Sequence, residues 1–312
     1  MFDQNEIIHC EVYYEMCDYM YMGQDDLPSG IVHVDIQSLP EFIDKIKNNG
    51  KKYVVVCSRS DFGLYYQAQH PSWRDMEKWI GMSMTPDFSY KGVNAAPRVD
   101  LDKCKESDKY SIKCWSWTSH TFDEIPENIV HLFLTNNGIQ GDDRLTSIPF
   151  GVNGTDGGRD AVNRLSKLDT TQERRDLLYV NFQFYTVERY RLWEFYRNSD
   201  NVTVYQSSRT AEQFYQDLCT HKFVLAPEGN GPDCYRMMEC LYAGAIPIMP
   251  MSQPLHFYLT NRARCVFSPS LFNLNEKALL DTFNEINKYE WNQDFLKKSY
   301  WKNLIEEKRK LL

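Results

Sequence analysis

The sequence predicts an α/β fold with parallel sheets, and three observations support it. Short apolar strands alternate with amphipathic helices over residues 177–250, at the spacing of βαβ units. A helix and a strand of the same kind occupy 41–60. A polar stretch rich in Gly and charged residues, 154–176, separates these regions. We expect a hinge there between two domains, because few core contacts would cross such a stretch and 312 residues suffice for two domains.

The first half contains a helix followed by several strands. The segment EFIDKIKNNGKKYVVVCSRS (41–60) predicts a helix, a stop at Asn-Asn-Gly and a buried β-branched strand. IVHLFLTNN (129–137) predicts a short apolar strand, and RLTSIPFGVNG (144–154) predicts a strand and a turn. Residues 61–125 are rich in turn formers and aromatic residues, and their pattern assigns no ordered series of elements.

The second half alternates more regularly. Strands are predicted at 177–184, 201–206, 221–228 and 245–250, and helices at 187–198, 211–219 and 233–244. Thr210 and Gln213 have the Thr-x-x-Gln form of a capping box at the start of the second helix. Gly244 stands where a glycine ends the third. The tail, 275–312, predicts two charged amphipathic helices.

Charge and composition exclude several classes of protein. The net charge is −8 and the pI is about 5.5, whereas a nucleic-acid-binding role needs a basic surface. No apolar run approaches the length of a membrane span, and the acidic N-terminus has neither signal-peptide nor transit-peptide character. The nine cysteines are odd in number, show no CxxC spacing and lie partly in apolar runs. We therefore expect reduced thiols and a cytoplasmic protein, and we give little weight to the sequons at Asn153 and Asn201.

The segment 221–250 carries the chemistry. A buried strand runs into Glu228-Gly229-Asn230-Gly231-Pro232-Asp233, and a helix starts at once. Ligands of open α/β sheets bind just beyond the carboxyl ends of strands. The two glycines let the backbone approach a ligand closely, and the amides of the helix's first turn suit an anion such as a diphosphate.

Two side chains on that helix extend the site. Arg236 and Glu239 lie three residues apart and so share one face. A guanidinium can fork two phosphate oxygens, and a carboxylate can accept hydrogen bonds from ribose hydroxyls. The opposite face is predicted to enter the core through Met237, Met238, Leu241 and Tyr242.

Two other interpretations of this segment stay open. Residues 229–234 are close to the dinucleotide fingerprint G-x-G-x-x-G, but Cys234 replaces the third glycine and Gln253 stands where the ribose-binding acid belongs. Alternatively, Arg236 and Glu239 simply pair with each other on a solvated helix face.

The same string resembles the hallmark segment of exostosin-like glycosyltransferases, family 47 and its microbial and viral relatives. The matching positions are Pro227, Gly229, Asn230, Gly231, Asp233, Arg236, Glu239, Gly244, Ile246, Pro247 and Ile248. Tyr235 and the pair Met237-Met238 depart from the family pattern, which puts donor preference in doubt. Looser matches upstream are Asn181, Arg189, Arg191, Asn136-Asn137 and Asp61. Together the resemblance covers roughly 53–63 and 129–250.

This resemblance implies a GT-B fold, in which two Rossmann-like domains face an interdomain cleft. It implies an acceptor-side domain at 1–155, a nucleotide-sugar-binding domain at 156–285, and helices at 286–312 that pack back on the first domain. The implied reaction is an inverting glycosyl transfer that needs neither metal nor cofactor, with a nucleotide-sugar donor (a UDP-sugar is favoured) and a glycan or other hydroxyl acceptor. A viral relative would act in the host cytoplasm.

Residue roles follow from the resemblance and the spacing together. Arg236 and the helix start are expected to stabilise the departing diphosphate. Donor binding is assigned to Asn181, Arg189, Glu228, Gly229, Asn230, Gly231, Asp233, Arg236 and Glu239. Inversion also needs a general base near the acceptor hydroxyl, on the first half or in the cleft. Asp61, just past a buried strand, is the first candidate, with a capping role in its own turn as the alternative. Asp35, His33 and His120 are further candidates.

Some features and function classes compete with these assignments. Lys222 is either near the site or a strand-edge charge, and Asp100 and Asp102 form an Asp-x-Asp pattern that we interpret as a solvated charge cluster. A non-catalytic binder of nucleotides or glycans would show loss of Arg236 or Glu239, and neither is lost. A small-molecule α/β enzyme such as an epimerase is separated from a transferase by detection of a glycosylated product.

Overall fold

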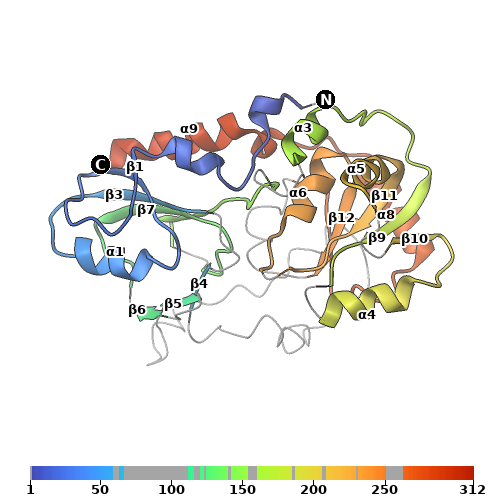
Figure 1. Ribbon diagram of the computed structural model, residues 1–312, viewed down its shortest axis with the longest axis horizontal. Coiled ribbons are helices and arrows are strands. Elements are labelled where there is room, and N and C mark those ends of the chain that lie inside the picture. The colour runs from blue at the N-terminus through green and yellow to red at the C-terminus, as the bar shows by residue number, and fades with distance from the viewer. Residues whose placement is uncertain are drawn as a thin grey trace.

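The computed structural model describes residues 2–58, 63–66, 112–115, 120–122, 124–139, 142–153, 160–184, 187–205, 209–229, 231–250 and 263–312. Within these ranges the protein contains two five-stranded parallel sheets and a three-stranded antiparallel sheet. Helices pack on the parallel sheets (Figure 1). The α/β prediction is confirmed.

The first parallel sheet belongs to the N-terminal half. Its order is β1 (Tyr19–Met20), β2 (Gly30–His33), β3 (Tyr53–Cys57), β7 (Ile129–Leu134) and β8 (Leu145–Ser147). In β3, Val55 packs in the same core cluster as helix α1 (Leu39–Ile46), whereas Val54 and Val56 belong to the cluster on the other face. Apolar side chains on both faces are what a parallel sheet covered on both sides requires.

A small antiparallel sheet is inserted between β3 and β7, in the region where the sequence pattern assigns no elements. It consists of β4 (Gly63–Tyr66), β5 (Ile112–Trp115) and β6 (His120–Phe122). The amide of Gly138, just after β7, donates to the carbonyl of Leu64 at 2.9 Å, so this sheet is attached near the carboxyl end of β7.

The second parallel sheet has the order β10 (Val202–Tyr205), β9 (Asp176–Asn181), β11 (His221–Leu225), β12 (Ile246–Pro250) and β13 (Val266–Ser268). From β9 the chain goes to one side to form β10 and then returns past β9 to form β11. The strand order therefore reverses between β9 and β11. Such a reversal is the place where open α/β sheets bind ligands, at the carboxyl ends of the strands.

Helices cover both faces of this sheet. Leu178 and Val180 of β9 share a core cluster with α4 (Val187–Tyr196) and α8 (Glu276–Ile286). Tyr179, between them, packs in the cluster of α5 (Ala211–Thr220) and α6 (Tyr235–Tyr242). The alternation along one strand thus places α5 and α6 on one face and α4 and α8 on the other.

The ends of these helices follow local sequence signals. The Thr210–Gln213 capping box is present at the start of α5, and Gly244 has a φ of +74° after α6, as predicted. Arg174 closes the carboxyl ends of both helices. Its guanidinium donates to the carbonyls of Leu218 and His221 at 2.7 and 2.8 Å and to the carbonyl of Ala243.

The structure differs from the predicted hinge at 154–176. Residues 160–176 contain helix α3 (Ala161–Ser166), whose N-cap is Asp160. Ala161, Leu165 and Leu168 are buried in the largest core cluster, which also includes residues of both parallel sheets. The stretch is polar overall, so its few apolar residues did not stand out in the sequence. In the structure they belong to a core that both halves share.

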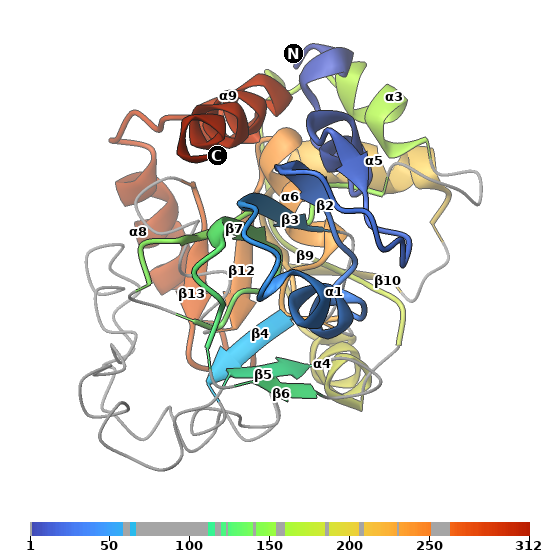
Figure 2. The ribbon, with the colours of Figure 1, turned by 90° about the vertical axis from the view of Figure 1, so that its left-hand side faces the viewer.

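The N-terminal segment and the C-terminal helix pack against each other. Helix α9 (Lys298–Lys308) runs beside the turns η1 (Gln4–Glu6) and η2 (Val12–Met16) (Figures 1 and 2). The Ser299 amide donates to a Glu6 carboxylate oxygen at 2.9 Å. Arg309, in the closing turn η7 (Arg309–Leu311), forms a two-fold ion pair with Asp18 at 2.8 and 2.9 Å. The two helices predicted in the tail are α8 and α9.

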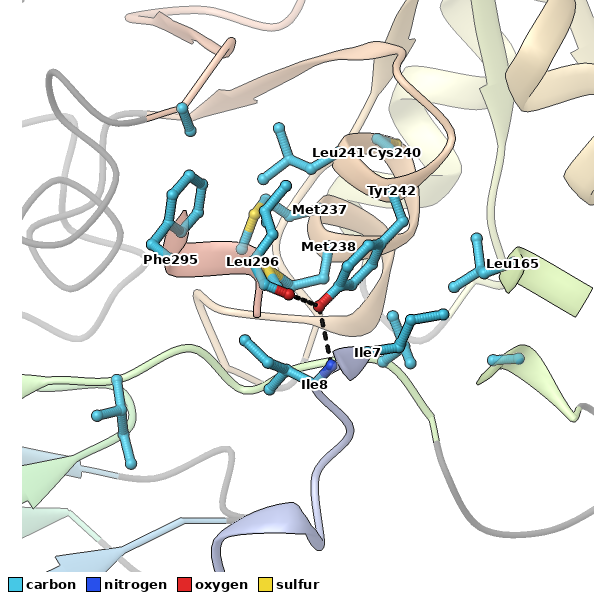
Figure 3. Packing of buried hydrophobic residues seen from close by; sticks show 14 of the residues in the cluster. Ile7, Ile8, Leu165, Met237, Met238, Cys240, Leu241, Tyr242, Phe295 and Leu296 are labelled. Atoms are coloured by element: carbon cyan, nitrogen blue, oxygen red, sulfur yellow. Dashed lines mark hydrogen bonds between the residues drawn. The ribbon is translucent and has the colours of Figure 1, made fainter. Parts of the chain in front are cut away.

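Tyr242 joins the two halves at the centre of the shared core. Its hydroxyl accepts a hydrogen bond from the Ile8 amide at 2.8 Å and donates to the Leu296 carbonyl at 2.6 Å (Figure 3). The ring is buried among Met238 and other apolar side chains, and Phe2 meets its edge. One side chain of α6 therefore connects the N-terminal segment with the segment that leads into α9.

Tyr242→Phe tests this connection. The substitution leaves the Ile8 amide and the Leu296 carbonyl buried without a partner, and we expect it to lower the free energy of unfolding by about 1–3 kcal/mol. Urea denaturation measures the effect. Tyr190→Phe is the matched control, because the Tyr190 side chain is on the surface of α4, and it should change stability by less than about 0.5 kcal/mol. Equal effects of the two changes would contradict the connecting role.

Candidate functional site

The candidate site lies where the strand order of the second sheet reverses. Asn181 ends β9, and residues 226–234 lead from β11 into α6. The amide of Ala226 still pairs with the Ile248 carbonyl at 2.8 Å, and the amide of Gly229 then donates to the Gly231 carbonyl at 3.0 Å. Within the segment predicted to carry the chemistry, the connection between β11 and α6 is thus a tight bend at the carboxyl edge of the sheet.

Arg189 of α4 supports this bend from behind. It is only 7% exposed, and it donates to the carbonyls of Glu228 at 2.8 Å, Pro227 at 3.2 Å and Gln183 at 3.3 Å. A Cβ atom on Gly229 would lie 3.3 Å from its Nη2 atom, so glycine fits here because of the arginine's close approach. The Arg189 guanidinium thus holds protein carbonyls, and its direct contact with a donor stays a prediction.

Asp233 fastens the bend to the N-terminal half. Its side chain is fully buried, and Oδ2 accepts from the amide of Phe150, which follows β8, at 2.8 Å. Its own amide donates at 3.0 Å to Oδ1 of Asn136, which follows β7. The carboxyl ends of strands from both sheets therefore meet at this residue. These hydrogen bonds give Asp233 a structural role between the halves, and donor binding by Asp233 stays a prediction.

Arg236 and Glu239 lie on one face of α6, as their spacing predicts, and Nε lies 3.5 Å from Oε2. The pairing interpretation is thus correct in part, but the solvated face is not, because the two side chains are 16% and 8% exposed. Glu239 also accepts from the Tyr215 hydroxyl at 2.9 Å. The Arg236 guanidinium donates to the Asn181 carbonyl and stacks 4.1 Å from the Phe214 ring centre.

One N–H group of Arg236 makes no hydrogen bond to any described residue. Its Nε atom is shielded from solvent and makes no hydrogen bond, since the contact with Glu239 is too long for one. At the adjacent start of α6, the N-cap residue Cys234 makes no side-chain hydrogen bond to the first turn. Burial raises the pKa of the Cys234 thiol, so this cap is uncharged. A buried guanidinium N–H that makes no hydrogen bond, beside a helix start that has only a neutral thiol at its N-cap, favours an anion.

A buried polar chain that sequence reasoning missed runs behind Asn181. The side-chain Nδ2 of Asn181 donates to the Tyr179 hydroxyl at 2.8 Å, and this hydroxyl donates to Oδ2 of Asp217 at 2.9 Å. Arg209 pairs with both Asp217 oxygens at 2.7 and 2.8 Å and stacks 4.4 Å from the Tyr205 ring centre. The capping box at Thr210 was the available signal, because it fixes the helix that carries Asp217. These bonds fix the orientation of the Asn181 side chain at the site.

Glu228 is the most unusual group at the site. Part of the side chain reaches solvent, but Oε1 is buried and has no hydrogen-bond partner among the described residues. Burial, aided by the negative charge of Glu188 in the first turn of α4, raises the pKa of Glu228 to about 8. The carboxyl group is therefore mostly neutral at pH 7.

The candidates for the general base are only partly described. Asp61 and the side chain of His120 lie outside the described residues. So do Asn230, predicted to bind the donor, and the Asp100–Asp102 pattern. Asp35 is exposed in the turn after β2. His33, at the end of β2, is buried, with Nε2 3.0 Å from the Ser58 hydroxyl and its ring 4.3 Å from the Tyr14 ring. Lys222 donates to the carbonyls of Arg174 and Arg175, which fits the strand-edge alternative.

Other features of the described residues lie away from this site. A cavity of about 370 Å³ occupies the opposite edge of the sheet, near Leu177, Val202 and Asn275, and no residue of the candidate site lines it. In the described ranges, no three His, Cys, Asp or Glu side chains cluster to hold a metal ion. No described helix combines the length and the apolar character needed to cross a membrane. The chain matches no known protein-family model and no curated protein.

Glu228→Gln tests the neutral state of the carboxyl group without any ligand. Because the folded pKa of about 8 lies above the ordinary value, the wild type loses stability as pH rises towards and through 8. The variant lacks this titration. As pH rises from about 5 to about 9, we expect the free energy of unfolding of the variant to increase relative to that of the wild type. The relative increase should be on the order of 1 kcal/mol or more. Glu194→Gln, on the exposed face of α4, is the control and should show no such trend.

Proposed function

We propose that this protein is an inverting glycosyltransferase of the GT-B type that takes its sugar from a nucleotide-diphosphate donor. The observation that carries the proposal is the buried Nε of Arg236, which makes no hydrogen bond within the described ranges, at the start of α6 where the strand order reverses. The resemblance of residues 222–248 to exostosin-like enzymes supports the same reaction. A UDP-sugar is the favoured donor, and a glycan hydroxyl is the favoured acceptor.

In this proposal the diphosphate binds between Arg236 and the first turn of α6. As the bond to the sugar breaks, negative charge grows on the departing phosphate, and a fixed guanidinium and helix amides stabilise it. Tyr215 bonds to Oε1 of Glu239, and Oε2, which faces Arg236 at 3.5 Å without a hydrogen bond, is the oxygen that would accept from a ribose hydroxyl. These groups supply the charge stabilisation that a divalent cation supplies in other transferases.

The acceptor binds, in this proposal, on the N-terminal half. The contacts of Asp233 with Phe150 and Asn136 support this, because they bring the carboxyl ends of β7 and β8 next to the donor bend. The general base belongs on that side, opposite the departing diphosphate. Asp61 stays our first prediction for it, and His33 and Asp35, at and just after the end of strand β2, are the alternatives within the described residues.

A melting-temperature screen with nucleoside diphosphates and their sugars tests donor binding, because a bound ligand raises the midpoint. Slow hydrolysis of the donor and formation of a glycosylated product then test catalysis. Binding without hydrolysis or transfer would indicate a non-catalytic module, and turnover of the nucleotide sugar without transfer to an acceptor would indicate an enzyme of the epimerase class.

Arg236→Gln is the decisive variant. It removes the cation and, because glutamine is shorter, also the bond from Nη1 to the Asn181 carbonyl, so circular dichroism and a thermal melt must show that the fold persists. We expect donor hydrolysis and transfer to fall about a hundredfold or more. Arg175→Gln is the control, because it removes the same charge from an exposed position and should retain activity. Undiminished turnover in the Arg236 variant would refute the assigned role.

A further inference from the structure

Glu228 presents a carboxyl oxygen that the protein itself leaves without a partner. Its backbone is fixed, since Arg189 holds both its carbonyl and that of Pro227. Its Oε1 is buried next to the bend at Gly229 and has no bond to any described residue. An ionised carboxylate oxygen in such a place is costly, whereas a neutral carboxyl group is tolerated.

The charges around Glu228 also oppose ionisation. Glu188 and Arg189 are the charged groups in the first turn of α4, and Asp233 and Arg236 are those at the start of α6. Among them, Glu188 is the one whose charge raises the pKa of Glu228. Arg189 directs its donors to carbonyl oxygens, and Asp233 is bonded to the Phe150 amide.

We infer that Glu228 binds the donor as the neutral acid and donates a hydrogen bond from its carboxyl group to a phosphate oxygen of the diphosphate. This inference rests on the proposed function and adds a binding group to it. A carboxylate beside Gly229 would repel a diphosphate at the start of α6. A neutral carboxyl group instead makes the short O–H···O⁻ bond that ranks among the stronger hydrogen bonds in proteins.

The consequence is a donor affinity that depends on the proton of Glu228. Binding of the anion favours the protonated form, so affinity is complete below a pH of about 8 and is lost as pH rises through that value. Above it, the dissociation constant should rise roughly tenfold for each pH unit. The terminal phosphate of UDP has its last pKa at about 6 and does not titrate in this range.

Calorimetric titration of the whole chain with UDP, or with GDP if UDP does not bind, tests the inference between about pH 7 and pH 9.5. The wild type should show the loss of affinity described above. Glu228→Gln retains a neutral donor and should bind with an affinity that is flat over this range. Glu188→Gln lowers the pKa of Glu228, so the loss should begin at a lower pH. Glu194→Gln, on the exposed face of the same helix, should follow the wild type.

Three results would overturn the inference. A flat wild-type profile, or an unchanged slope in Glu228→Gln, would mean that another group governs binding, while the proposed function would stand. Failure of both nucleotides to bind at any pH would remove the proposed function and this inference with it. A fourth result, a slope lost in Glu228→Gln and shifted in Glu188→Gln, supports the assignment.

Discussion

Helix α6 is tied to the first half of the chain at both of its ends, and the geometry of the candidate site depends on this double attachment. Just before its start, Asp233 bonds to the backbone after β8 and to Asn136 after β7. At its end, the Tyr242 hydroxyl bonds to the Ile8 amide and the Leu296 carbonyl. These bonds are buried, so water does not compete for them. The first turn of α6, which carries Arg236, is therefore fixed relative to both sheets.

The described arginines show how position decides the use of a cation. Arg189 and Arg174 donate to main-chain carbonyls, the first under the bend at 227–228 and the second at the ends of α5 and α6. Arg209 is neutralised by Asp217. Arg236 is the arginine at the bend whose Nε keeps a buried, unused donor. Arg236 also contacts the Asn181 carbonyl and Glu239, but of these four arginines it is the one with a buried N–H that makes no hydrogen bond.

Local sequence signals predicted the second half well, because its order depends on neighbouring residues. The β-branched and apolar runs, the Thr210 box and Gly244 all act within a few positions, and they appear in the structure as strands, a cap and a helix end. The roles of Arg189 and Asp233 were beyond reach, since spacing gives the face of a helix but not the partner across it. Contacts such as Ser299 with Glu6 join residues 293 positions apart, and no local pattern encodes them. The sheet β4–β6 likewise lay in a stretch without periodicity.

The packing of α9 against residues 2–16 has a consequence for synthesis on the ribosome. The face of the first sheet that carries Val54 and Val56 is completed by residues 295–305, which are translated almost 250 residues later. During that interval the emerging N-terminal half has an apolar surface without its permanent cover. Closing so long a loop of chain is slow, and exposed apolar surface invites association between nascent chains. A holdase chaperone that shields this surface until α9 is made would therefore help this protein to fold. Such help matters less for the second half, whose order depends on neighbouring residues.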